Sequence, residues 1–181
     1  LNMATQSPGE LLDYPDSIGS PHIDTRVLIL DDDDRPVSRG EAGHIAVRNF
    51  NTALGYHRNP EAAATTWRPR KNDPEGLAWC FTGDIGVMDK DGRIAIVDRS
   101  KDIILTGGES VPSVEVETVY SEHTGISDCA AVGVDDTRWG EAILLVAVKC
   151  DDNTSSSALA EDLFLFGRDR LAGFKVPRRI T

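Results

Sequence analysis

The chain has 181 residues, of which 40% are hydrophobic and 27% charged, so it is long enough to bury a core in one or two domains. Its formal net charge of −11, with a run of four aspartates at residues 31–34, argues against a general nucleic-acid-binding or anionic-membrane-binding surface. Three cysteines without a C-x-x-C pair, Cys80, Cys129 and Cys150, indicate reduced thiols of an intracellular protein, buried as small apolar side chains.

The first third of the chain predicts a β-hairpin followed by a short helix. Residues 1–20 are rich in Pro, Gly, Ser and Asp and predict mostly loop. Residues 26–30 and 44–47 predict the two strands of the hairpin, joined by a polar turn at 31–36. The aspartates of this turn lack the interleaved spacing and the distal Glu of a calcium loop, so we expect a solvated turn. Residues 60–66 predict a short helix with Pro in its first turn.

The middle of the chain predicts a loop, a second hairpin and a domain junction. Residues 68–76 are charged and contain proline, as a loop does. The basic residues of this loop are Arg68, Arg70 and Lys71. They could contact a phosphate, but we expect them to be solvated. The apolar residues on either side of a turn at 89–92 predict an antiparallel hairpin, and they are Ile85, Val87, Ile94, Ile96 and Val97. The charged run 98–102 then precedes the strand-like residues 103–105, and we interpret this break as a domain junction.

Two glycines and a helix are expected after the junction. Gly107 and Gly108 permit a positive φ or a close approach by a ligand, and the alternative is an ordinary strand-to-helix turn. The helix is expected from about Val114, with Ser110 or Ser113 as its N-cap. Its apolar side is formed by Val116, Val119 and Tyr120. Its solvated side carries Glu115 and Glu117.

The end of the chain predicts two more strands and a last helix. Residues 128–134 and 142–148 are expected to be strands, and residues 151–157 a polar turn. Helical periodicity covers 158–171, and the residues along one face are Leu159, Leu163, Phe166 and Arg170. The four histidines have no metal-ligand spacing, so no metal site is predicted.

Three short motifs occur in order across the middle of the chain, namely Thr82-Gly83-Asp84, Asp98-Arg99 and Gly107-Gly108-Glu109. Together they resemble motifs of the adenylate-forming superfamily, which includes acyl-CoA synthetases, luciferases and the adenylation domains of peptide synthetases. The resemblance extends from about residue 19 to residue 177 and points most to fatty or aromatic acyl-CoA ligases. The sequence departs from the family at 110–113, and also at Cys80 and Phe81, where relatives carry an aromatic and a polar or basic residue.

The resemblance implies an α+β fold in two parts. Residues 1–98 are expected to form the β-rich, barrel-like end of a large AMP-binding domain, and residues 99–181 most of a small α+β C-terminal lid domain. Residues 173–178 resemble the Lys-x-Pro segment that precedes the catalytic lysine of the family, which is expected beyond Thr181. We therefore expect a fragment that contains no catalytic residue and is inactive alone.

The resemblance also implies ligand-binding roles. Asp84 is expected to accept hydrogen bonds from the ribose hydroxyls of ATP or AMP, and Arg99 to donate to the same ribose or its phosphate. Gly107 and Gly108 correspond to the turn near the coenzyme A channel, and Lys101 to the interdomain hinge. The alternatives are a turn carboxylate for Asp84, a solvated Lys101, and ordinary turn chemistry for the glycines. The implied cofactors are ATP and coenzyme A, with Mg²⁺ accompanying ATP.

The implied activity is that of an acid–thiol ligase, which converts a carboxylic acid to an acyl-adenylate and then to an acyl-CoA thioester, as in fatty acid metabolism. The alternatives are a non-catalytic interaction or regulatory domain that retains the fold, and an adenylation domain of another branch. The expected partners are the acid, ATP and CoA, and no nucleic acid. Because no apolar run spans a bilayer and the first residues lack secretory character, a cytoplasmic or peroxisomal protein is expected.

Overall fold

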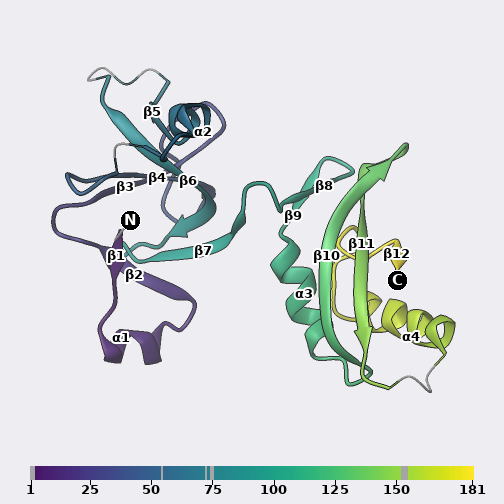
Figure 1. Cartoon of the computed structure of the whole chain (residues 1–181). Helices are drawn as coiled ribbons and strands as arrows, with labels where there is room; N and C mark the ends of the chain where they lie inside the picture. Colours follow the sequence, from purple (N-terminus) through teal and green to yellow (C-terminus); the bar gives the residue numbers. More distant parts are fainter. Residues whose placement is uncertain (1–2, 54, 72, 74–75, 152–154) are drawn as a thin grey trace. The chain divides into compact units, whose positions relative to one another are not determined.

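The computed structural model describes residues 3–53, 55–71, 73, 76–151 and 155–181. The chain divides into two compact units, Leu1–Ser100 and Lys101–Thr181 (Figure 1). The boundary expected from the sequence, between residues 98 and 99, lies two residues earlier, so Arg99 belongs to the first unit. Both units combine strands with short helices, which confirms the expected α+β fold class.

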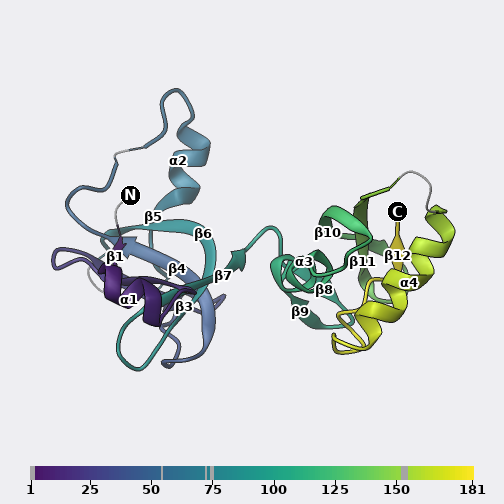
Figure 2. The ribbon, with the colours of Figure 1, turned by 90° about the horizontal axis from the view of Figure 1, so that it is seen from below.

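The first unit is built on a curled antiparallel sheet (Figures 1 and 2). Its strands are β1 (Ala4–Thr5), β2 (Ser17–Pro21), β3 (Arg26–Leu30), β4 (Ala42–Arg48), β5 (Trp67–Pro69), β6 (Ala78–Met88) and β7 (Ile94–Arg99). Within the described residues the order is β1-β2-β7-β6-β4-β3, and β5 pairs with the first residues of β6. The curled sheet agrees with the barrel-like subdomain expected from the sequence.

The two predicted hairpins form the centre of this sheet. β3 pairs with β4 from Arg26 opposite Arg48 to Leu30 opposite His44, and β6 pairs with β7 around the expected turn. Because side chains alternate between the two faces of a strand, one face supplies a buried cluster formed by Val27, Ile29, Ile45, Val47, Met88 and Ile94. The predicted helix is α2 (Pro60–Thr66), and its N-cap Asn59 accepts a hydrogen bond from the Ala62 N–H at 3.1 Å.

The expectation of mostly loop before residue 20 was wrong. In addition to β1 and β2, a short helix, α1 (Pro8–Asp13), occupies this segment. Ser7 is its N-cap: the Ser7 hydroxyl accepts a hydrogen bond from the Glu10 N–H at 3.3 Å, and the Glu10 carboxylate accepts one from the Ser7 N–H at 2.8 Å. This reciprocal capping box stabilises a helix that composition alone did not indicate.

The second unit packs two helices against one sheet. Its strands are β8 (Ile104–Thr106), β9 (Glu109–Val111), β10 (Ile126–Asp136), β11 (Gly140–Lys149) and β12 (Arg179–Ile180), and its helices are α3 (Ser113–Ser121) and α4 (Ser156–Arg168). In the described part of this unit the order is β10-β11-β8-β9, and β12 adds to β11 in parallel. The two predicted strands are thus the long antiparallel pair β10 and β11.

One buried cluster joins both helices to this sheet. The helices contribute four residues to this cluster: Val116 and Tyr120 from α3, and Leu159 and Leu163 from α4. This confirms the apolar sides that the sequence predicted for the two helices. Arg170, expected along the face of the last helix, lies beyond the end of α4 and stacks its guanidinium 3.8 Å from the ring of Phe166. Of the expected polar turn at 151–157, Ser156 and Ser157 already belong to α4, and residues 152–154 lie outside the described residues.

The expected N-cap of α3 was wrong. Pro112 occupies the N-cap position, where no side chain caps the helix, and Ser113 is the buried first helical residue. Ser110 instead lies in β9. Proline is compatible with this position because its fixed φ suits a chain that enters a helix from an extended segment.

Candidate functional site

The Thr82-Gly83-Asp84 motif lies in a bulge of β6. In the ladder with β4, Phe81 faces Ala46 and Ile85 faces His44, so three residues of β6 stand opposite the single residue Ile45. Bulges of this kind bend a strand and change the direction of its side chains, and they are frequent beside functional sites. The motif is therefore placed where the regular pleat of the strand is interrupted.

Local hydrogen bonds hold the bulge in shape. Gly83 has φ +81°, a conformation that favours glycine. The Thr82 hydroxyl donates to the Ile45 carbonyl at 3.3 Å and accepts from the Asp84 N–H at 3.1 Å. The Ser100 N–H donates to the Gly83 carbonyl at 2.8 Å. The backbone around Asp84 is thus fixed from β4 and from the end of β7.

Asp84 and Arg99 are brought together by the β6–β7 pairing. They face each other in the register of the hairpin, and Arg99 Nε lies 3.2 Å from Asp84 Oδ1. The Asp84 side chain is 21% exposed and that of Arg99 58% exposed. Next to them, the buried Asp98 accepts a hydrogen bond from the Arg99 N–H at 2.7 Å. A held carboxylate beside an accessible guanidinium is suited to a ligand that carries both hydroxyl groups and negative charge.

Gly107 and Gly108 form the two-residue turn of the β8–β9 hairpin rather than a strand-to-helix turn. Their φ values are +62° and +87°, and two consecutive positive φ angles are typical of the tight turns that match the twist of a hairpin. The Gly107 N–H donates to the Trp139 carbonyl at 2.9 Å, and a Cβ at Gly107 would lie 3.0 Å from the Trp139 ring. A Cβ at Gly108 would meet nothing within 4 Å, so this side of the turn is open.

Lys101 is exposed and is the first residue of the second unit. It follows the strand β7, which ends at Arg99, and precedes β8. The structure thus places this residue, which the sequence indicated as a hinge, at the boundary between the two units.

The sequence interpretation missed a buried ion pair in the first unit. Asp34, expected in a solvated turn, is only 4% exposed and receives both Nη atoms of Arg68, at 2.6 and 3.0 Å. The Lys71 N–H also donates to Asp34, at 2.8 Å. The hydrogen bonds from Arg68 lower the pKa of Asp34 to about 2 although burial opposes the shift. Arg68 lies in β5, so the expectation of solvated basic residues in this segment was also wrong.

The glutamates of α3 are bound rather than solvated. Glu115 forms an ion pair with Lys175, whose Nζ lies 2.5 and 2.7 Å from the two carboxylate oxygens. The Glu117 carboxylate accepts a hydrogen bond from the Ala131 N–H of β10 at 2.9 Å. These contacts tie the start of α3 to the Lys-x-Pro segment and to the sheet, which the helical periodicity did not reveal.

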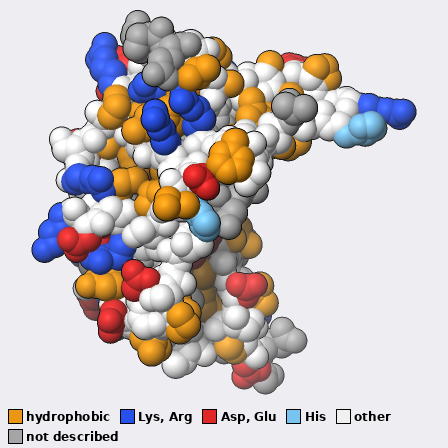
Figure 3. Space-filling model, turned by 90° about the vertical axis from the view of Figure 1, so that its left-hand side faces the viewer, with side chains coloured by type: hydrophobic (Ala, Val, Ile, Leu, Met, Phe, Trp, Pro, Cys, Tyr) orange, Lys and Arg blue, Asp and Glu red, His pale blue; other side chains and the backbone are white. Residues whose placement is uncertain are grey.

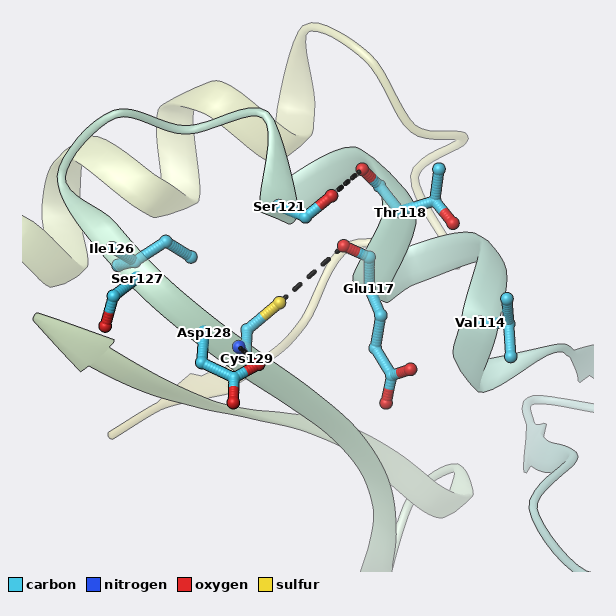
Figure 4. Close-up of a pocket in the computed structure, with 8 residues that line it drawn as sticks. All are labelled: Val114, Glu117, Thr118, Ser121, Ile126, Ser127, Asp128 and Cys129. Atoms are coloured by element: carbon cyan, nitrogen blue, oxygen red, sulfur yellow. Dashed lines mark hydrogen bonds between the residues drawn. The ribbon is translucent and has the colours of Figure 1, made fainter.

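A groove of about 310 Å³ lies between α3 and β10 (Figure 4). At its floor the Cys129 thiol donates to the Glu117 carbonyl, with sulfur and oxygen 3.6 Å apart. Burial, followed by the charges of Glu117 and Asp128, raises the pKa of the Cys129 thiol, so this cysteine is a poor nucleophile at neutral pH. Cys80 is buried as expected, whereas Cys150 is exposed.

In the described part of the chain, no group of three or more His, Cys, Asp or Glu side chains is placed to hold a metal ion. No described helix is both long enough and apolar enough to cross a membrane. On the face drawn in Figure 3, Lys and Arg side chains lie at several separate places, with Asp and Glu side chains between them.

Comparisons with known proteins agree on one family. Residues 115–181 match the model of the AMP-binding enzyme C-terminal domain. The chain is 38% identical over 179 residues to a long-chain-fatty-acid–CoA ligase of Salmonella typhimurium and 37% identical over 164 residues to a feruloyl-CoA synthase of Amycolatopsis. These matches cover 98% and 91% of this chain, and 30% and 31% of the two relatives.

A solved structure has a similar fold over nearly all of this chain. The o-succinylbenzoate CoA synthetase of Bacillus subtilis, in complex with its acyl-adenylate intermediate, matches with a TM-score of 0.79 and 26% identity, over 99% of this chain and 34% of that one. The chain therefore spans about a third of the length of the proteins that it matches. It belongs to the adenylate-forming enzymes, and its residues 115–181 belong to their AMP-binding C-terminal domain.

Proposed function

We propose that this chain is part of an ATP-dependent acid–thiol ligase of the acyl-CoA synthetase type. The observation that carries the proposal is the Asp84 carboxylate, held on the bulge of β6 beside Arg99. The named CoA ligases among the relatives support it. The carboxylic acid, ATP and coenzyme A are the proposed substrates of the full-length ligase.

The proposed reaction proceeds in two steps. A carboxylate oxygen attacks the α-phosphorus of ATP, the bond from that phosphorus to the bridging oxygen breaks, and pyrophosphate leaves. The thiolate of coenzyme A then attacks the acyl carbon, and AMP leaves as the bond from that carbon to the phosphate oxygen breaks. Because AMP is a far better leaving group than oxide, the first step makes the second one feasible. The protein contributes by orienting the reactants and by stabilising charge.

Asp84 and Arg99 are proposed to bind the ribose of ATP. Arg99 contacts Oδ1 of Asp84, so Oδ2 and the remaining lone pair of Oδ1 are available to accept hydrogen bonds from two neighbouring ribose hydroxyls. The exposed guanidinium of Arg99 is proposed to donate to the ribose or its phosphate. The turn at Gly107 and Gly108, open on the side of Gly108, is proposed to border the path of coenzyme A.

Mg²⁺ is proposed only as the companion of the ATP phosphates. A solved o-succinylbenzoate CoA synthetase of Bacillus subtilis contains ATP and a magnesium ion, but no described residue of this chain is assigned as a ligand. An intracellular location is also part of the proposal, since ATP and coenzyme A are intracellular. The relatives reported above are bacterial, and they do not support a peroxisomal location.

Asp84→Ala in the full-length ligase is expected to raise the KM for ATP by about 10- to 100-fold, because a charged acceptor of hydrogen bonds is worth about 1.5–3 kcal/mol. The KM for the carboxylic acid and the melting temperature are expected to change little. Steady-state kinetics and thermal denaturation measure these quantities, with Asp33→Ala in the exposed turn before β4 as the matched control. Unchanged ATP affinity together with a large loss of thermal stability would show that Asp84 is only a turn residue.

Lys101→Pro is expected to impair the two half-reactions unequally. If the second unit changes position between adenylation and thioester formation, the backbone at Lys101 must change φ and ψ. Proline would prevent this change because it fixes φ at about −65°. Thioester formation is expected to fall more than pyrophosphate release, and each is measured separately. Lys101→Ala is the matched control, because alanine leaves φ free, and it is expected to leave both rates unchanged. Equal losses of both rates in Lys101→Pro would argue against a hinge.

A further inference from the structure

Arg68 connects a buried aspartate to the strand that carries Asp84. We infer that Arg68 is a positioning residue for the nucleotide site: by stacking on Phe81 it holds the upstream end of the bulge that presents Asp84. This inference rests on the proposed function, because it assigns Arg68 a task in binding ATP. The sequence suggested only a solvated loop residue at this position.

The first step of the argument is the anchoring of Arg68 itself. Its two Nη atoms contact the two carboxylate oxygens of Asp34, at 2.6 and 3.0 Å, so the pair is bidentate. Asp34 is nearly fully buried and adopts φ +61°, which turns it inward from a run of otherwise exposed or half-buried aspartates. A planar fork held at both ends has little freedom to reorient, unlike a lysine ammonium in the same place.

The second step is the contact between Arg68 and Phe81. The guanidinium carbon lies 3.6 Å from the centroid of the Phe81 ring, a close cation–π stack. Phe81 is half-buried, so its ring is shielded from solvent on part of its surface. A basic group from β5 therefore lies against the residue of β6 that directly precedes the Thr82-Gly83-Asp84 motif.

The third step is the place of Phe81 in the ladder. Phe81 is the last residue of β6 to pair with β4 before the bulge, and Ile85 is the first to pair after it. The intervening residues follow no regular register with β4, so their geometry depends on the hydrogen bonds of Thr82 and on how each end of the bulge is held. Downstream, Asp84 is held by its pairing with Arg99. Upstream, the backbone pairing of Phe81 with Ala46 is supplemented by the stack of Arg68 on the Phe81 side chain.

The test uses Arg68→Lys in the full-length ligase, which keeps the charge but loses the fork and the planar stack. Because small displacements of binding groups lower affinity substantially, we expect the KM for ATP to rise about fivefold. The KM values for the acid and for coenzyme A should stay within about twofold. The matched control is Arg35→Lys, since Arg35 forms an exposed ion pair with Asp33 in the same turn. ATP affinity is also measured by calorimetry, which does not depend on turnover.

A double-mutant cycle separates positioning from general stability. In an Asp84→Ala background, Arg68→Lys should not raise the KM for ATP further, because its effect is transmitted through Asp84. Additive effects, or equal increases in all three KM values, would overturn the inference.

If Arg68→Lys does not fold, Phe81→Leu provides a second test, because it removes the stack while leaving the ion pair. Phe81→Leu should give the same selective increase in the KM for ATP. An unchanged ATP affinity in Phe81→Leu would also overturn the inference. Absence of any CoA ligation by the unmodified ligase would instead refute the proposed function.

Discussion

Gly167→Ala is expected to destabilise the second unit by about 3 kcal/mol, the upper range for overpacking a core. Helix propensity predicts the opposite sign, since alanine is favoured over glycine inside a helix by about 1 kcal/mol. Packing decides the outcome here. A Cβ on Gly167 of α4 would overlap the hydroxyl of Tyr120 and lie 2.7 Å from its Cζ. Tyr120 is fully buried in α3 as part of the core cluster, so its ring can move away only by displacing other core side chains.

Urea denaturation of the 181-residue chain measures this effect, and Gly173→Ala is the matched control because a Cβ there meets nothing within 4 Å. Tyr120→Phe provides a rescue. Its hydroxyl has no hydrogen-bond partner among the described residues, so its removal is expected to be neutral or stabilising. The double variant Gly167→Ala/Tyr120→Phe should recover most of the loss. A stabilised Gly167→Ala would mean that the two helices separate more easily than this packing indicates.

Local elements with strong signals were predictable from the sequence. The strand at Arg26–Leu30 and the helix at Pro60–Thr66 have the expected bounds, because an apolar run between polar turns and a Pro at N1 are local signals. The α1 helix was missed although its signal was present: Ser7 followed three residues later by Glu10 is a capping box. The surrounding polar composition is typical of loops, so composition alone conceals this motif.

The candidate site was predictable in its residues but not in its shape. Asp84 and Arg99 lie on the two arms of a predicted hairpin, but the register set by the turn would pair Asp84 with Asp98. A register shift between Ile85 and Gly86 is what makes Asp84 face Arg99, and the turn did not reveal it. The bulge was not predictable, because it appears only when β6 is paired with β4, a strand far away in the sequence. The same holds for Glu115 and Lys175, which are 60 residues apart and meet only in the packed unit.

The aspartate run shows why partners across the fold cannot be derived from composition. Four consecutive carboxylates at 31–34 predict a solvated turn, and Asp32 and Asp33 are indeed exposed. Asp34 differs because its positive φ turns the backbone, and asparagine and aspartate tolerate that conformation better than most residues. Which aspartate turns inward depends on β5, which supplies Arg68.

Asp34→Ala is expected to destabilise the first unit by about 2–3 kcal/mol at neutral pH, less than the cost of about 3–5 kcal/mol for removing one partner of a fully buried ion pair, because the Arg68 side chain is 36% exposed and water can solvate part of its charge. The Arg68 guanidinium and the Lys71 N–H would lose their shared acceptor. Alanine is also disfavoured at φ +61°. Urea denaturation followed by tryptophan fluorescence measures the loss, with Asp33→Ala as the matched control, because Asp33 pairs with Arg35 at the surface. Equal stabilities of the two variants would contradict the prediction.

The same ion pair predicts a pH dependence with a defined sign. The pKa of Asp34 is about 2 in the folded chain and about 3.9 when unfolded, so the unfolded state binds the proton more readily. This depressed pKa contributes about 2 kcal/mol that is fully present above about pH 4 and is lost as the pH falls toward 2. Asp34→Asn, which tolerates the positive φ but has no titrating carboxylate, should lack this part of the acid dependence. The difference in stability between the unmodified chain and Asp34→Asn should therefore shrink between pH values of about 4 and 2, whereas a constant difference would place the titrating group elsewhere.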